Sequence, residues 1–209
     1  MTILFIHGWG FDAGFWRPLA NRLPDFRPEV VDLGFFGEPV TPTPERPLVV
    51  AHSMGLAWAL AHLPRPWAGV VAVNAFARFT RSPSFVEGVT PRLVERMLSR
   101  FDSEPETVLR DFLCRCGVEA PVLDGMRQAP LRNALAWLAE CDEQAALAAL
   151  DCPLLALSGT RDLVVPETMS RAAFNACDLV LVEGAGHTLP LSHPDWVASQ
   201  IRQFAARAA

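Results

Sequence analysis

The chain has 209 residues, of which 51% are hydrophobic, and its formal net charge is −5 with a pI near 5.5. This length and composition predict one domain with a large hydrophobic core. Every basic residue is arginine, and the acidic balance argues against a nucleic-acid-binding protein. The apolar run Thr2 to Ile6 is short and is broken by His7 and Gly8, so it favours neither a signal peptide nor a membrane span, and we expect a cytoplasmic protein without membrane association.

The five cysteines predict neither disulfides nor a metal site. Their number is odd, and Cys114 and Cys116 lie in a helix-like stretch that lacks a second pair of ligands. We therefore expect reduced, mostly packed thiols and no bound metal.

Strands and helices alternate along the first third of the chain. Apolar runs predict strands at 2–6, 29–33, 47–50 and 68–74. Helices are predicted at 15–23 and 54–63, and a proline-rich loop occupies 39–47. Such alternation indicates parallel strands joined by helical crossovers.

The alternation pauses between residues 76 and 151, where the sequence becomes helical with polar faces, and this segment is the predicted lid. Thr90 and Pro91 predict one helix start, and Ser103 with Glu106 predicts a capping box for another. Two further helical pieces are expected from Pro130 and from Asp142. The alternation then resumes with strands at 152–158 and 179–182 and helices at 167–176 and 194–206.

Ser53 lies at the junction of a predicted strand and a predicted helix, in the pentapeptide Ala-His-Ser-Met-Gly at 51–55. This sequence matches the nucleophile elbow G-x-S-x-G except that Ala51 replaces the first glycine. The elbow needs small residues on both sides of the serine, because strand and helix approach closely around a strained turn. The alternative interpretation is a serine that caps a helix.

Two more residues of the kind that a serine nucleophile needs follow later strands. Asp162 comes after the strand at 152–158, and His187 comes after the last strand. Loops at the carboxyl ends of parallel strands gather at one edge of a sheet. In the α/β hydrolases, whose triads follow this order, the imidazole removes the serine proton and the carboxylate orients the imidazole. The sequence therefore predicts a Ser53, His187 and Asp162 triad.

Other residues compete for the roles of base and acid. We expect structural roles for the other four histidines, which are His7, His52, His62 and His193. Asp32 follows an earlier strand, and Asp151 precedes its strand. Some hydrolases carry the acid after the strand at 68–74, but Asn74 and Ala75 stand there.

Hydrolysis of an ester also needs two hydrogen-bond donors for the negative oxygen that develops in the transition state. The backbone N–H groups of Trp9 and Met54 are predicted to form this oxyanion hole. The Trp9 side chain is expected to line the acyl pocket, and the alternative is an ordinary core aromatic residue.

Four segments together resemble the pimeloyl-[acyl-carrier protein] methyl ester esterases of biotin synthesis, a branch of the α/β-hydrolase superfamily. They are His-Gly-Trp-Gly at 7–10, the elbow, residues 159–166, and Gly186-His187 followed by Ser192-His193-Pro194. The resemblance implies the α/β-hydrolase fold with a helical lid. The chain departs from the family pattern because it starts with the strand before His7, so we expect a reduced, mostly parallel sheet of about six strands that lacks the first two of the usual eight.

The same resemblance implies a serine carboxylesterase that hydrolyses the methyl ester of pimeloyl-[acyl-carrier protein] through an acyl-enzyme on Ser53. It implies no metal and no organic cofactor. The expected partners are the acyl-carrier protein and small esters, and the expected state is a monomer. In the predicted lid, the resemblance places Arg110 and Phe112 at the substrate, with Arg110 facing the carrier or its phosphopantetheine. A solvated Arg110 paired with Glu106 is the alternative.

The charge pattern of the lid agrees with an acidic partner. Residues 76–135 contain nine arginines and eight acidic residues, so this part is +1 and the remainder of the chain is −6. Arg92, Arg96 and Arg100 recur at a spacing of four and are expected on one helical face, as a docking stripe or as an ordinary solvated face.

Three other functions are compatible with parts of the pattern. A general short-chain carboxylesterase or thioesterase would use the same triad. A hydrolase-like binding protein would keep the triad without turnover. A dinucleotide-binding protein is suggested by Gly8, Gly10 and Ala13 after a first strand, with Asp32 ending the second strand, but this interpretation leaves the later Ser, Asp and His loops unexplained.

Overall fold

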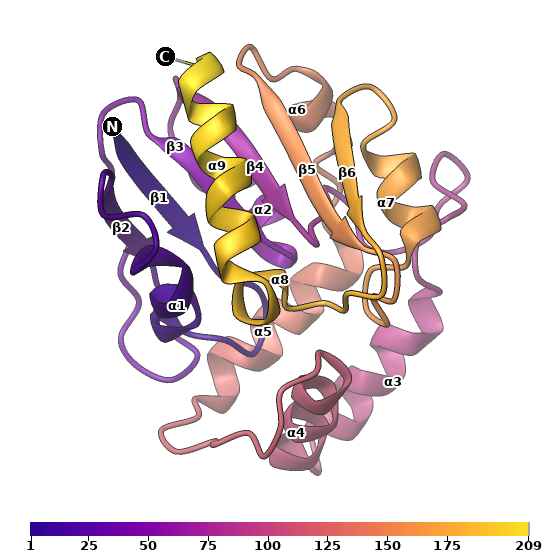
Figure 1. Ribbon diagram of the computed structural model, residues 1–209. Helices are drawn as coiled ribbons and strands as arrows, with labels where there is room; N and C mark the ends of the chain where they lie inside the picture. The colour runs from indigo at the N-terminus through magenta and orange to yellow at the C-terminus, as the bar shows by residue number, and fades with distance from the viewer. Residues whose placement is uncertain (209) are drawn as a thin grey trace.

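Six parallel strands form one sheet, in the order β2-β1-β3-β4-β5-β6, in the computed structural model, which describes residues 1–208 (Figure 1). The strands are β1 (Thr2–Ile6), β2 (Arg27–Val31), β3 (Leu48–His52), β4 (Gly69–Val73), β5 (Leu154–Gly159) and β6 (Asp178–Val182). The predicted all-parallel sheet is confirmed, and the predicted strand ends differ from the observed ones by at most two residues.

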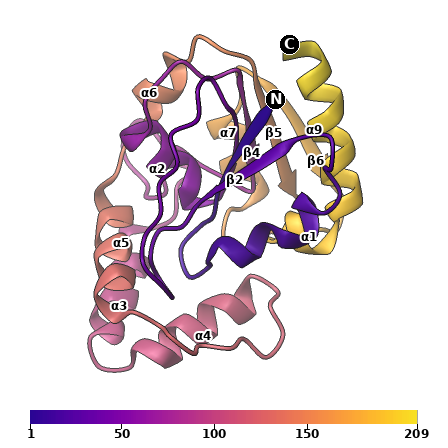
Figure 2. The same cartoon turned by 90° about the vertical axis from the view of Figure 1, so that its left-hand side faces the viewer.

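Helices cover both faces of this sheet. On one face lie α1 (Arg17–Ala20) and α9 (Pro194–Ala208), and on the other lie α2 (Met54–His62), α6 (Gln144–Ala148) and α7 (Glu167–Ala173), as Figures 1 and 2 show. Alternate residues of β1 serve the two layers, since Ile3 and Phe5 pack toward α9 whereas Leu4 and Ile6 pack toward α2. Because both faces are covered, β3 and β4 are buried along their whole length, which is typical of parallel sheets.

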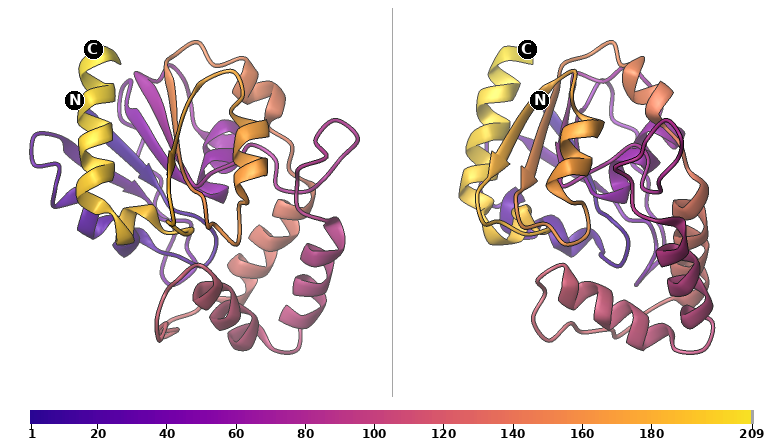
Figure 3. Two further views of the ribbon diagram at one scale, coloured as in Figure 1. Left: turned by 45° about the vertical axis from the view of Figure 1, so that its right-hand side comes forward. Right: turned by 90° about the vertical axis from the view of Figure 1, so that its right-hand side faces the viewer.

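The predicted lid segment runs below the carboxyl ends of the strands (Figure 3). It contains α3 (Pro91–Phe101), α4 (Pro105–Arg115) and α5 (Gln128–Glu140), followed by α6 at its return to the sheet. Pro91 begins α3 as predicted. None of the helices within residues 1–208 is long and apolar enough to cross a bilayer.

The predicted capping box at Ser103 and Glu106 is wrong. Helix α4 begins at Pro105, so the capping position falls on Glu104, which makes no side-chain cap. The Ser103 hydroxyl instead donates a hydrogen bond of 3.2 Å to the Arg100 carbonyl at the end of α3. Proline favours the first helical position, and this preference moved the helix start one residue beyond the predicted one.

Two short helices also depart from the prediction. The helix expected at 15–23 is split into a 3-10 turn, Ala13–Trp16, which Asp12 caps through the Gly14 N–H, and the single turn of α1. Helix α8 (Leu189–Ser192) was not predicted. It directly follows His187 and joins the last loop to α9.

At Gly55, helix α2 approaches the backbone at the end of β1 too closely for a side chain, so a substitution there tests the packing of α2 on the sheet. A Cβ atom at Gly55 would lie 2.6 Å from the Ile6 carbonyl oxygen and 2.7 Å from that of His7. We expect Gly55→Ala to lower the free energy of unfolding by roughly 1–3 kcal/mol, because α2 must move away from β1. Urea denaturation measures the loss.

Gly37→Ala is the matched control, since a Cβ there would meet nothing within 4 Å. Equal stability of the two variants would show that α2 is not held this closely against β1.

Candidate active site

Ser53 occupies the strained turn that the elbow motif predicts. Its backbone has φ 55° and ψ −127°, between the end of β3 and the start of α2. Its N–H donates to the Val73 carbonyl at 3.1 Å, and a Cβ atom at Gly8 would lie only 2.8 Å from the Ser53 Cβ. The Ser53 side chain makes no helix-capping hydrogen bond, which removes the alternative of a simple capping serine.

The structure brings the three predicted triad residues together. His187 Nε2 lies 3.1 Å from Ser53 Oγ, and His187 Nδ1 lies 2.8 Å from Asp162 Oδ2. All three residues are buried. A carboxylate that accepts the Nδ1 proton leaves Nε2 free to accept the hydroxyl proton of serine.

Asp162 is held by its own loop. Its second oxygen, Oδ1, accepts the backbone N–H groups of Val164 at 2.7 Å and Val165 at 2.8 Å. These two backbone donors fix the orientation of the carboxylate, so that Oδ2 faces His187.

Two polar residues that the sequence did not assign to the site hold the His187 loop. His52 Nε2–H donates to the His187 carbonyl at 3.0 Å, and Asn74 Nδ2 donates to the Gly186 carbonyl at 3.1 Å and to Asp162 Oδ2 at 2.9 Å. Both residues come from strand ends beside the elbow, at β3 and β4. Their position at the carboxyl ends of two buried strands was the feature of the sequence that could have identified them as site residues.

His52 has the structural role that was predicted for it. It is fully buried and its ring packs against Phe11, Phe15 and Trp16. Burial, followed by the nearby His187, lowers the pKa of His52 well below its usual value. The other ring nitrogen, Nδ1, is buried without a hydrogen-bond partner among the described residues, whereas the Ser53 hydroxyl is bonded to His187, so His52 is not placed to act as the base.

The other three histidines also lie outside the hydrogen-bonded triad. His7 is buried, donates from Nδ1 to the Gly8 carbonyl at 2.9 Å and accepts the Leu33 N–H on Nε2 at 3.0 Å. His62 is exposed and stacks on Trp58, and His193 hydrogen-bonds Ser192.

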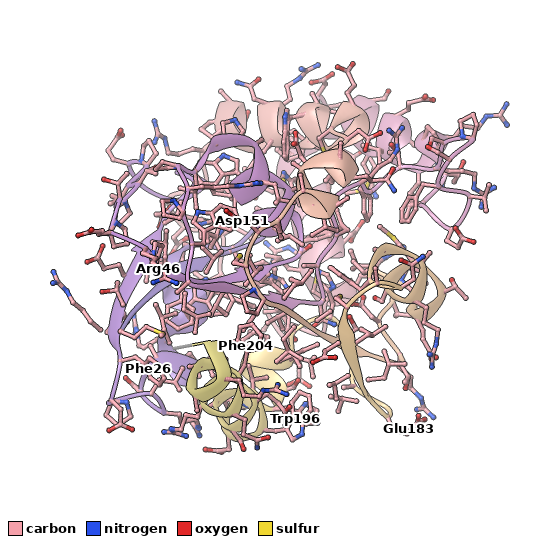
Figure 4. The ribbon with its side chains drawn as sticks, turned by 90° about the horizontal axis from the view of Figure 1, so that it is seen from above. Phe26, Arg46, Asp151, Glu183, Trp196 and Phe204 are labelled. Carbon is pink, nitrogen blue, oxygen red and sulfur yellow. The ribbon has the colours of Figure 1, made fainter. Side chains whose placement is uncertain are left out.

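The competing acids are likewise placed elsewhere. Asp32 Oδ1 accepts the Gly34 N–H at 2.9 Å and Oδ2 accepts the Ala13 N–H at 3.0 Å. The adjacent His7, with these N–H groups, lowers the pKa of Asp32 to about 2. Asp151 is exposed at the opposite, amino end of the strands, where Figure 4 labels it near Arg46.

A cavity of about 780 Å³ opens at Ser53 between the sheet and the lid. Its apolar lining includes Phe76, Phe79, Met97, Leu135 and Leu138. The four charged residues that line it all come from α3 and α4, and they are Arg96, Arg100, Asp111 and Arg115. The cavity is therefore apolar over most of its wall and charged only on one side of the lid.

Trp9 and Met54 both line this cavity beside Ser53. The Trp9 indole N–H donates to the Leu131 carbonyl of α5 at 2.8 Å, and its ring packs edge-on against Phe112. Within residues 1–208, the backbone N–H groups of Trp9 and Met54 make no hydrogen bond. They are available to a bound ligand.

The two predicted lid residues lie in different places. Phe112 lines the cavity, but Arg110 does not, and its guanidinium donates to the Pro121 carbonyl at 3.3 Å. The alternative pairing of Arg110 with Glu106 is also absent from the described part of the chain. Arg96 and Arg115 line the cavity instead. Arg115 was not predicted from the sequence as a site residue.

The glycines that suggested a dinucleotide site serve other contacts. The space beside Gly8 is filled by Ser53, and a Cβ atom at Gly10 would lie 2.9 Å from Leu109 of α4. A pyrophosphate would have to displace the elbow or the lid, so the structure disfavours this alternative.

The other large hollow in the described part of the chain lies away from the candidate triad. A wider hollow of about 1270 Å³ between α6, α7 and the end of α9 contains no triad residue. The described residues contain no group of three or more His, Cys, Asp or Glu side chains that could hold a metal ion.

The chain is similar in sequence to known proteins over nearly its whole length. The chain is 30% identical, over 97% of its length, to the biotin biosynthesis bifunctional protein BioHC of Cellvibrio japonicus, and it spans 47% of that protein. It is 29% identical, over 98% of its length, to a pimeloyl-[acyl-carrier protein] methyl ester esterase of Xanthomonas campestris, of which it spans 95%.

Solved structures agree on the fold. A thermophilic esterase from Thermogutta terrifontis superposes with a TM-score of 0.79 at 22% identity, covering 100% of this chain and 90% of that one. An esterase from Exiguobacterium antarcticum gives 0.82 at 16% identity, covering 99% and 92%. Residues 3–200 match the model of the alpha/beta hydrolase family, and the chain belongs to that family.

Proposed function

We propose that the protein is a serine carboxylesterase with Ser53 as nucleophile, His187 as general base and Asp162 as the acid that orients the base. The observation that carries the proposal is the hydrogen-bonded series from Ser53 to His187 to Asp162, which begins at a strained elbow and opens into the cavity. Strain of this kind costs on the order of 1–3 kcal/mol and is concentrated at functional sites.

The geometry supports a two-step reaction. His187 takes the Ser53 proton as Oγ attacks the ester carbonyl, and the N–H groups of Trp9 and Met54 stabilise the oxyanion. His187 then gives the proton to the leaving alcohol, which leaves an acyl-enzyme on Ser53. Water activated by His187 releases the acid, and no step needs a metal or an organic cofactor.

For the substrate we propose the methyl ester of pimeloyl-[acyl-carrier protein], in biotin synthesis. The proposed substrate is the one named for the relatives of this chain, and the lining of the cavity supports it. Its apolar wall suits an acyl chain, and Arg96 and Arg115 at its lid side suit an acidic carrier or a phosphate on its prosthetic group. The monomeric state and the cytoplasmic location stay predictions.

A general short-chain carboxylesterase or thioesterase is the second candidate. The observation in its favour is that two of the lid arginines expected to meet a carrier, Arg100 and Arg110, are engaged or placed elsewhere. Arg100 is already paired with Glu104 and Asp111, and Arg110 lies outside the cavity lining.

The nucleophile is tested by covalent labelling. We expect a fluorophosphonate to add once per chain at Ser53, and Ser53→Ala to lose both labelling and nearly all ester hydrolysis, because the Ser53 hydroxyl is the group that His187 Nε2 contacts. Mass spectrometry locates the adduct. Turnover that persists in Ser53→Ala would remove the serine mechanism, and labelling of the parent protein without turnover would favour the non-catalytic binding protein.

The carrier is tested by reversing charge at the lid. We expect Arg96→Glu, Arg115→Glu and Arg110→Glu each to lower kcat/KM for a carrier-linked methyl ester by up to about tenfold, because charges at the rim of an interface govern the encounter rate. Hydrolysis of a small soluble methyl ester should stay nearly unchanged. Added salt should reproduce the loss in the parent protein.

Arg46→Glu is the control, since Arg46 is exposed at the amino end of the strands (Figure 4). Equal losses on both substrates would indicate a damaged lid. No loss on either substrate would favour the general esterase.

A further inference from the structure

Asn74 has a position and a set of contacts that the proposed reaction does not yet use. It directly follows β4, is fully buried, and has a left-handed backbone with φ 47°. Its Nδ2 lies 2.9 Å from Asp162 Oδ2 and 3.1 Å from the Gly186 carbonyl oxygen. Both partners can only accept hydrogen bonds, so the amide nitrogen must face them.

This residue is costly for the fold. The left-handed conformation is unfavourable for residues other than glycine, although asparagine tolerates it better than most. The Asn74 Oδ1 atom is buried without a hydrogen-bond partner among the described residues, which destabilises the folded state. Conformational strain and an unsatisfied polar atom on one residue indicate a role in the site more than a role in stability.

We propose that Asn74 is a positioning residue for the Asp162–His187 pair. This inference rests on the proposed function of these two residues as acid and base. Asp162 Oδ2 receives the His187 Nδ1 proton and the Asn74 amide proton together, while Oδ1 is held by Val164 and Val165. With two donors on each oxygen the carboxylate has one orientation, and the second Asn74 contact holds the loop that carries His187.

The same contact has an electrostatic consequence. The Asn74 N–H draws negative charge away from the oxygen that stabilises protonated His187. Removing that N–H leaves more charge for the imidazolium, so the protonated base becomes more stable and activity is lost at a higher pH than in the parent protein.

Other charged and titratable groups near this pair do not obscure the effect. The His52 ring lies 4.7 Å from the His187 ring, and burial lowers the pKa of His52. The buried Cys116 thiol comes from the end of α4, and burial raises its pKa well above the usual range. Arg161, on the Asp162 loop, is exposed and always charged. The directions of these two pKa shifts keep His52 and Cys116 uncharged around neutral pH, so neither is expected to produce the change in the profile.

The test is a double-mutant cycle between Asn74→Gly and Asp162→Asn. Glycine tolerates φ 47°, so this change removes the amide without adding backbone strain. The readout is the second-order rate of fluorophosphonate addition to Ser53, with ester kcat and KM beside it. We expect Asn74→Gly to lower the labelling rate and kcat roughly 10- to 100-fold with little change in KM. In the Asp162→Asn background, adding Asn74→Gly should lower the labelling rate by no more than about threefold.

The pH profile of labelling provides the second readout. We expect the acid side of the profile to move to higher pH in Asn74→Gly. Arg46→Gly is the matched control, because Arg46 also has a left-handed backbone, with φ 45°, and is exposed at the far end of the strands (Figure 4). It should leave rate and profile unchanged. Thermal unfolding checks each variant, and if Asn74→Gly fails to fold, Asn74→Ser enters the same cycle.

The outcomes separate this inference from the proposed function. If Asn74→Gly lowered the labelling rate equally in the parent protein and in Asp162→Asn, or if the pH profile did not move, the positioning role would be overturned. The proposed triad would be unaffected by either result. A parent protein that the reagent does not label would overturn both. A coupled cycle in a protein that does not hydrolyse the carrier-linked ester would support the role of Asn74 and remove the proposed substrate.

Discussion

The close approach of backbone segments around Ser53 is the constraint on which the rest of the site depends. At three points this approach leaves no room for a side chain. A Cβ atom would lie 2.8 Å from Ser53 at Gly8, 2.6 Å from the Ile6 carbonyl oxygen at Gly55, and 2.2 Å from the Ala185 carbonyl oxygen at Gly159. These glycines bring together the turn after β1, the elbow, and the loops that carry Asp162 and His187. The triad distances follow from this packing, because each side chain is short.

The lid is hydrogen-bonded to residues of the candidate site. Trp9, which lines the cavity, donates through its indole to Leu131 of α5, and Thr188, next to His187, donates to the Cys116 carbonyl after α4 at 3.1 Å. The lid that supplies the walls and charges of the cavity therefore contacts the proposed oxyanion turn and the base loop. We therefore expect substitutions deep in the lid to affect both the proposed oxyanion turn and the base loop.

Much of the fold and the central residues of the site were predictable from the sequence. The short apolar runs carry strong β propensity and stand between clear loop signals, and Ser53, Asp162 and His187 each follow such a run. Local patterns were insufficient where two preferences competed, as at Ser103, where the preference of Pro105 for the first helical position decided the helix start. The placement of Arg110 depended on the path of the loop after α4, which supplies its Pro121 partner and has no periodic pattern.

Asn74 and His52 were missed as partners of the triad for a different reason. Their side chains bond to the backbone of the His187 loop, which lies more than 100 residues away in the sequence. The loop comes near them because β3, β4, β5 and β6 are consecutive in the sheet. A polar residue at the carboxyl end of a buried parallel strand is a usable signal for such a role. It identifies the residue but not its partner.

The small size of the sheet does not weaken the site. Every residue of the proposed triad and oxyanion hole follows one of the adjacent strands β1, β3, β5 and β6, and Asn74 follows β4 between them. Strand β2 contributes only anchoring contacts, through Asp32 to the Ala13 N–H and through the Leu33 N–H to His7. Ala51 also fits, since its methyl group lies in the apolar cluster beneath α2. The candidate site is therefore built from five adjacent strand ends and the lid, and the sixth strand supplies none of its proposed reacting groups.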